Sequence, residues 1–199
     1  MLNLKKIMTR SLLAMALGAC GSVFAAPVYH VSIDTSKLGS GNAVLDLQLG
    51  GLTGAAPVTA TLNHFMGAYG ASDLSGDASG SIGSSVRLVN DAGFSDLLQE
   101  VMLGGLFSFD LSFDVGTGGM DGSSFTAMLT NPDFTANLGM GTPLVDIELM
   151  PGQADMISPA NAFASVSPAA VSAVPEPSTL LSMVTGLGLL GFGLRRRAR

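Results

Sequence analysis

The sequence predicts a mainly β protein: a single antiparallel, jelly-roll-like β-sandwich with a helix at each end of the chain. Short segments in which apolar and polar residues alternate recur through the middle of the chain, and clusters of Gly, Asp, Ser and Asn separate them. No long segment between them has the 3.6-residue period of an amphipathic helix. Short strands joined by turns favour a sandwich, because each strand buries only one face.

The strongest predicted strand covers residues 107–115, where Phe107, Phe109, Leu111, Phe113 and Val115 alternate with serines and aspartates. The other predicted strands share this alternation and cover residues 29–34, 45–49, 58–63, 82–89, 125–129 and 145–149. Residues 94–102 break the pattern. We expect one short helix there, with Ser95 as its N-cap and Phe94 packing against it from outside.

These elements divide the chain into four parts. We expect a signal peptide over residues 1–25, an acidic β-sandwich domain over 26–150, a spacer rich in Ala, Ser and Pro over 151–173, and a C-terminal membrane segment over 174–199. Residues 157–166 are an alternative last edge strand.

The N-terminal segment has the layout of a secretory signal. Basic residues precede an apolar run over 11–19. Val23 and Ala25 are residues that signal peptidase accepts at positions −3 and −1, which indicates cleavage after Ala25. Cleavage after Ala26 is less suitable because Pro27 would follow it. A rival interpretation is a bacterial lipobox over residues 17–20, in which Cys20 carries a lipid. If Cys20, the only cysteine, is removed with the signal, the body has no disulfide.

The C-terminal segment has three parts in a fixed order. Pro175, Glu176 and Pro177 form a stiff, extended stretch. Residues 178–194 then contain no charge and predict a transmembrane helix of roughly 26 Å, slightly shorter than a bilayer core. Four arginines follow directly: Arg195, Arg196, Arg197 and Arg199. They end the membrane segment and hold its C-terminal end in the cytoplasm.

This order of elements resembles the PEP-CTERM sorting signal of Gram-negative bacteria. The resemblance implies export by the general secretory route, transient anchoring in the inner membrane, recognition near Pro175, Glu176 and Pro177 by an exosortase, and release of the body to the cell surface or outside. It also implies a link to exopolysaccharide and biofilm systems. Residues 29–49, 94–115 and 122–129 are similar to an uncharacterised group of PEP-CTERM proteins, a similarity that implies no activity.

Charge is distributed unevenly along the chain. Between Ala26 and Val174 only Lys37 and Arg87 are basic, against fourteen acidic residues, so the body carries a net charge of −12. Such a surface repels nucleic acid phosphates and anionic lipids. We therefore exclude nucleic acid as a partner and favour divalent cations or neutral glycans.

Residues that could carry catalysis or hold a metal do not form a recognisable motif. His30 and His64 lie outside any HxH or HExxH pattern, and no GxSxG motif holds a serine. Asp110 and Asp114 project from one strand face about 13 Å apart, too far for a glycosidase pair. We expect neither an enzyme nor a metal centre.

Two weaker signals concern ions and sugars. Asp73, Asp77, Asp121 and Asp133 lie in predicted loops, where Ca²⁺ finds ligands, although no EF-hand spacing is present. The chain has no Trp. Because Tyr29 falls on the predicted inner face, Tyr69 is the one candidate platform for stacking a sugar.

The sequence thus predicts an exported surface or matrix protein without a cofactor. One alternative is a carbohydrate-binding module, with Ca²⁺ as a stabilising ion. A secreted hydrolase ranks third, because no acid–base set is clustered in the sequence.

Overall fold

The computed structural model describes residues 27–91, 93–139, 143–159 and 162–169. Within these ranges no helix is long and apolar enough to cross a membrane. The predicted signal peptide, the cleavage positions Ala25 and Ala26, and the whole C-terminal segment from residue 174 onward lie outside the described residues.

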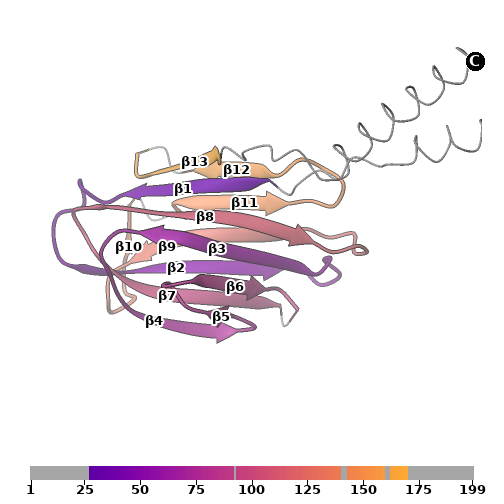
Figure 1. Cartoon of the computed structure of the whole chain (residues 1–199), viewed down its shortest axis with the longest axis horizontal. Helices are drawn as coiled ribbons and strands as arrows, with labels where there is room; N and C mark the ends of the chain where they lie inside the picture. The colour runs from indigo at the N-terminus through magenta and orange to yellow at the C-terminus, as the bar shows by residue number, and fades with distance from the viewer. Residues whose placement is uncertain (1–26, 92, 140–142, 160–161, 170–199) are drawn as a thin grey trace, which may run out of the picture. The chain divides into compact units, whose positions relative to one another are not determined.

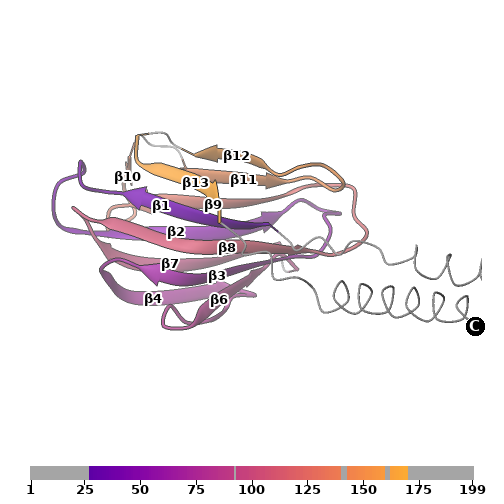
Figure 2. The same ribbon diagram turned by 45° about the horizontal axis from the view of Figure 1, so that its top comes forward.

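The described chain forms two antiparallel sheets packed face to face, which confirms the predicted β-sandwich (Figures 1 and 2). Sheet A has the order β13-β1-β8-β3-β6-β5. Its strands are β1 (Val28–Asp34), β3 (Val58–Met66), β5 (Ser79–Gly80), β6 (Ser85–Val89), β8 (Leu106–Val115) and β13 (Ala164–Pro168).

Sheet B has the order β12-β11-β9-β2-β7-β4, with β10 paired to β9. Its strands are β2 (Asn42–Gly51), β4 (Tyr69–Gly76), β7 (Phe94–Met102), β9 (Ser123–Thr130), β10 (Asn137–Leu138), β11 (Val145–Leu149) and β12 (Met156–Pro159). The pairs β1–β8, β2–β7 and β3–β6 nest inside one another along the chain, as in a jelly roll. The short β5 departs from that pattern, because it pairs with β6 in sheet A.

The core lies between the sheets and follows from the period-two alternation of the strands. On β8 the side chains of Phe107, Phe109, Leu111 and Phe113 are buried, while the residues between them face outward. Phe125 of β9 comes from the opposite sheet, and its ring centroid lies 6.4 Å from that of Phe109 and 6.1 Å from that of Phe113. Edge-to-face contacts of this kind add to the hydrophobic stabilisation of the core.

The short helix predicted over residues 94–102 was wrong, because this segment is strand β7. Every second side chain of β7 points inward, as in any strand. Two of these inward side chains, Ser95 and Gln99, are polar, so the sequence shows no regular alternation of apolar and polar residues. The buried Ser95 hydroxyl accepts a hydrogen bond from the Val89 N–H at 2.8 Å. The buried Gln99 amide donates to the carbonyl oxygens of Gly70 and Ala71, each at 3.1 Å. These partners from other strands satisfy the Ser95 hydroxyl and the Gln99 amide nitrogen and make a strand possible, while Gln99 Oε1 is buried without a hydrogen-bond partner among the described residues.

The spacer expected over residues 151–173 needs correction as well. Residues 156–159 form β12 and pair with β11, and residues 164–168 form β13 and pair with β1. The sandwich therefore extends to Pro168, well beyond the predicted boundary at residue 150. Edge strands rich in Ser and Ala bury few side chains, so their sequences lack a clear apolar period.

Replacing Phe125 with Ala should lower the free energy of unfolding by about 3–5 kcal/mol, because it leaves a cavity where three aromatic rings meet. Thermal and denaturant unfolding of the full chain in nonionic detergent, followed by circular dichroism, measures this loss. Phe134→Ala is the matched control, because Phe134 is 56% exposed and its loss should cost less than about 1 kcal/mol. Equal losses in the two variants would contradict the described packing.

Candidate functional site

The outer face of sheet A brings together the only two histidines of the chain. His30 Nδ1 lies 2.7 Å from Asp110 Oδ1, and His64 Nδ1 lies 2.8 Å from Asp110 Oδ2. The fold therefore brings together three titratable side chains that are far apart in the sequence. An ionised carboxylate only accepts hydrogen bonds, so both imidazoles must carry their proton on Nδ1.

Strand register explains why the three side chains meet. His30 on β1 and Asn63 on β3 both pair directly with Asp110 on β8. The pairing of β3 and β8 shifts just after Asn63, and His64 has a positive φ of 52°, which turns its side chain back toward Asp110. Neither the pairing of distant strands nor this bulge is visible in the sequence.

The pKa of Asp110 lies below its usual value, chiefly because the carboxylate accepts the hydrogen bond of His30 and, to a smaller extent, that of His64. The His64 side chain is 77% exposed. An open, solvated cluster of this kind can hold protons or orient a polar ligand, but it provides little of the water-excluding enclosure that favours catalysis.

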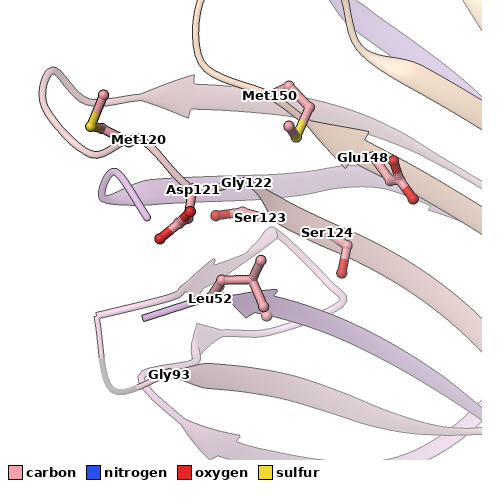
Figure 3. A pocket seen from close by; sticks show the side chains of 11 residues that line it. Leu52, Gly93, Met120, Asp121, Gly122, Ser123, Ser124, Glu148 and Met150 are labelled. Atoms are coloured by element: carbon pink, nitrogen blue, oxygen red, sulfur yellow. The ribbon is translucent and has the colours of Figure 1, made fainter. Parts of the chain in front are cut away.

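A pocket of about 480 Å³, which we call the glycine pocket, lies where β2 ends, β9 begins and β11 ends (Figure 3). Four glycines line it: Gly50, Gly51, Gly93 and Gly122. Its apolar lining comes from Leu52, Met120 and Met150, all exposed. Its volume falls in the range that suits small ligands.

Two carboxylates also line the glycine pocket. Figure 3 shows Asp121 and Glu148 well apart from one another, with the Ser124 hydroxyl nearer to Glu148. The two carboxylates could therefore contact a ligand in the glycine pocket from two sides.

A buried amide fixes the inner wall of the glycine pocket. Asn90 Oδ1 accepts the Val58 N–H at 2.8 Å, and its Nδ2 donates to Ala56 O at 3.0 Å and to Ser123 Oγ at 2.9 Å. A Cβ at Gly51 would lie 2.7 Å from Asn90 Nδ2, so glycine is required for this close approach.

A second pocket of about 330 Å³, which we call the Phe134 pocket, lies at the opposite end of β2, where that strand begins. Phe134, Pro132 and Leu98 give it an apolar side, and Asp73 and Glu100 contribute carboxylates. An exposed aromatic ring beside carboxylates is a combination that recognises the face of a sugar and its polar substituents together.

A rigid loop presents Phe134. Its φ is +55°, a left-handed conformation that is costly for a bulky residue. Asn131 holds the loop in this shape: its Oδ1 accepts the N–H groups of Thr135 at 2.8 Å and Ala136 at 2.9 Å, and its Nδ2 donates to Thr135 Oγ1 at 2.8 Å. Strain that is retained in order to expose an aromatic ring points to a contact residue.

Tyr69, the candidate sugar platform, is partly buried. Its ring packs against Phe65 and Phe107, with centroid distances of 6.0 Å and 5.6 Å, and its hydroxyl donates to Met66 O at 2.9 Å. Burial raises the pKa of Tyr69 to about 12. Sequence reasoning missed Phe134 because it considered only Tyr and Trp; the signal was an aromatic residue inside a polar turn, Asn131–Thr135.

The aspartates considered for Ca²⁺ are spread over the molecule. Asp73 lies on β4 and contributes to the Phe134 pocket, Asp121 lies in the glycine pocket, and Asp77 and Asp133 lie in loops. Among the residues that the structure describes, no three or more His, Cys, Asp or Glu side chains form a group that could hold a metal ion.

Fold and sequence together define an acidic β-sandwich that is followed by a separate C-terminal segment. Residues 173–197 match the family described as the PEP-CTERM protein-sorting motif. The match confirms the predicted sorting motif. It indicates an exported protein that is anchored in a membrane and processed in an exosortase-dependent way. No curated protein and no solved structure matches the chain, so the similarity of the body to an uncharacterised group stays a prediction.

Replacing Asp110 with Asn should destabilise the fold by about 0.5–1 kcal/mol at neutral pH, since the hydrogen bonds are charge-assisted but partly exposed. Because the pKa of Asp110 is lowered in the folded state, its stabilisation is fully present above the ordinary carboxyl pKa of about 4 and is lost as the pH falls through the lowered value. The difference between wild type and variant should therefore shrink on acidification.

Melting temperatures measured by circular dichroism at pH 7 and at pH 3 test this prediction. Asp114→Asn is the control, because Asp114 is exposed on the same strand face. A wild-type advantage over Asp110→Asn that stays constant at both pH values would contradict it.

Proposed function

We propose that this protein is a non-enzymatic component of the cell surface or extracellular matrix, which an exosortase releases from the membrane and which acts alongside exopolysaccharide in biofilms. The observation that carries the proposal is the PEP-CTERM motif over residues 173–197, placed after a β-sandwich that has its own core. Signal peptidase would remove residues 1–25, and exosortase would act near Pro175, Glu176 and Pro177.

The fold is compatible with removal of both terminal segments. Tyr29 at the start of β1 pairs with Pro168 at the end of β13, and the Ala169 N–H donates to Val28 O at 2.6 Å. The two ends of the described body therefore leave the sandwich side by side. Cuts after residue 25 and near residue 176 would fall outside all thirteen strands, so the body would keep its hydrogen-bond ladders after processing.

A non-catalytic role is supported by the placement of the titratable groups. The cluster of His30, His64 and Asp110 stands on an open sheet face and contributes to neither the glycine pocket nor the Phe134 pocket. A hydrolase would need its acid and base to flank a bound substrate. Alanine variants of His30 and His64 in an assay against the producer's own polysaccharide test the hydrolase alternative.

A carbohydrate-binding module is the second candidate function. The Phe134 pocket favours it, because an exposed aromatic ring there stands with carboxylates on one surface. In this case the body would hold the matrix polysaccharide after its release, and the sorting motif would only deliver it.

Replacing Pro175, Glu176 and Pro177 together with alanine should abolish processing, so that the protein accumulates in the membrane fraction and its extracellular amount falls at least about tenfold. The physical reason is that alanine permits a helix where prolines impose an extended segment. Quantitative immunoblots of membrane and culture-medium fractions measure the distribution.

Ser172→Ala is the control for this variant, because Ser172 lies just before the matched residues. It should be released like the wild type. Normal release of the triple variant would overturn the exosortase part of the proposal.

A further inference from the structure

The outer face of sheet B carries an unusual excess of negative charge. Six carboxylates lie at outward-facing positions of its strands: Asp46, Asp73, Asp96, Glu100, Asp146 and Glu148. The described strands of this sheet contain no Lys, Arg or His, whereas sheet A has His30, His64 and Arg87. The negative charge on the strands of sheet B therefore has no basic side chain on the same strands to offset it.

The face is also continuous between the two pockets. The outward residues of β2 are Val44, Asp46, Gln48 and Gly50. Val44 lines the Phe134 pocket and Gly50 lines the glycine pocket. Gly50 lies six positions after Val44 along the extended strand, which corresponds to roughly 20 Å. A ligand that reaches both pockets must therefore be an extended chain of units and not a single small molecule.

The carboxylates of this face differ in their partners: Asp96 accepts a hydrogen bond from the Ser75 hydroxyl and Glu100 accepts one from the Ala71 N–H. One oxygen of Asp46 and one of Asp146 are buried without a hydrogen-bond partner among the described residues. Burial, and to a smaller extent the nearby Asp96, raise the pKa of Asp46 to about 6. A positive group placed over this part of the sheet would favour the ionised form of Asp46.

We propose that the outer face of sheet B binds a linear polysaccharide whose sugars carry free amino groups, with Phe134 stacking on one sugar and Asp46 and Asp96 pairing with ammonium groups further along. The proposal rests on the proposed function, since it identifies the polysaccharide that the exported body holds. The contributions are complementary: the aromatic ring contacts the apolar face of a sugar, and the carboxylates accept hydrogen bonds from its ammonium.

Other ligand classes fit this face less well. Anionic polysaccharides and nucleic acids are repelled by it. Neutral glycans carry no charge, so the negative charge of the carboxylates would not strengthen their binding. A divalent cation needs several oxygen ligands that converge on one point, and the described carboxylates form no such group. Carboxylates spread over strands β2, β4, β7 and β11 instead match positive charges repeated along a polymer that crosses this face.

Isothermal titration of the full chain, in nonionic detergent at low ionic strength, tests the proposal with two probes. The first is a glucosamine hexasaccharide with free amines, and the second is its fully N-acetylated counterpart. We expect the free-amine hexasaccharide to bind at least about tenfold more tightly, with an affinity that falls as salt is added.

Three variants locate the site. Asp46→Asn should weaken binding of the free-amine hexasaccharide about two- to fivefold, as expected for one partly exposed ion pair. Phe134→Ala should weaken it about three- to tenfold, through loss of stacking on the sugar face. Asp114→Asn, which removes a carboxylate from sheet A, should leave the affinity unchanged. Circular dichroism verifies that each variant is folded.

Several results would overturn the inference: equal affinity for the two hexasaccharides, no binding of either, binding of Ca²⁺ alone, or an Asp114→Asn effect as large as that of Asp46→Asn. The last result would indicate attraction by net charge without a site. Because release into the medium is measured separately, a protein that is exported normally but fails these titrations contradicts this inference and leaves the proposed function standing.

Discussion

The structure depends on the meeting of Phe125 of sheet B with Phe109 and Phe113 of sheet A. This contact fixes which residues of β8 and β9 face the interior. Because successive side chains of a strand point to opposite faces, it also fixes which residues face outward. A slip of one residue in β8 would bury Asp110 and expose the phenylalanines. The same constraint acts on β2, where the buried Leu45, Leu47 and Leu49 place Asp46 and Gln48 outside.

Sequence patterns predicted the elements in which apolar residues mark the inner face. β8 is the clearest of them, and β1, β2, β3, β9 and β11 follow the same rule. The pattern failed in β7, because Ser95 and Gln99 occupy inward positions and depend on partners from other strands. The edge strand β4 was missed, and the region of β12 and β13 was predicted only as one alternative strand over residues 157–166, because few side chains of these strands are buried. Sites were less predictable than strands: His64 reaches Asp110 through a bulge, and Phe134 is exposed by a strained loop.

The two outer faces of the sandwich differ in chemistry although both are polar. On sheet A, two histidines donate hydrogen bonds to the central carboxylate of Asp110, so that both oxygens of this carboxylate have partners within the fold. Sheet B leaves its carboxylates without basic neighbours and has a pocket at each end of β2. This asymmetry suits a body with one structural face and one binding face, in a protein that carries a PEP-CTERM sorting motif.

The most direct test of this account is the intact mass of the protein from membrane and extracellular fractions. The account predicts an extracellular species that begins at Ala26 and ends between Pro175 and Pro177, and that retains the whole sandwich. A species that keeps Arg199 and stays in the membrane, with nothing released, would contradict it. A lipid-sized addition at Cys20 would contradict it as well, since the anchor would then lie at the other end of the chain.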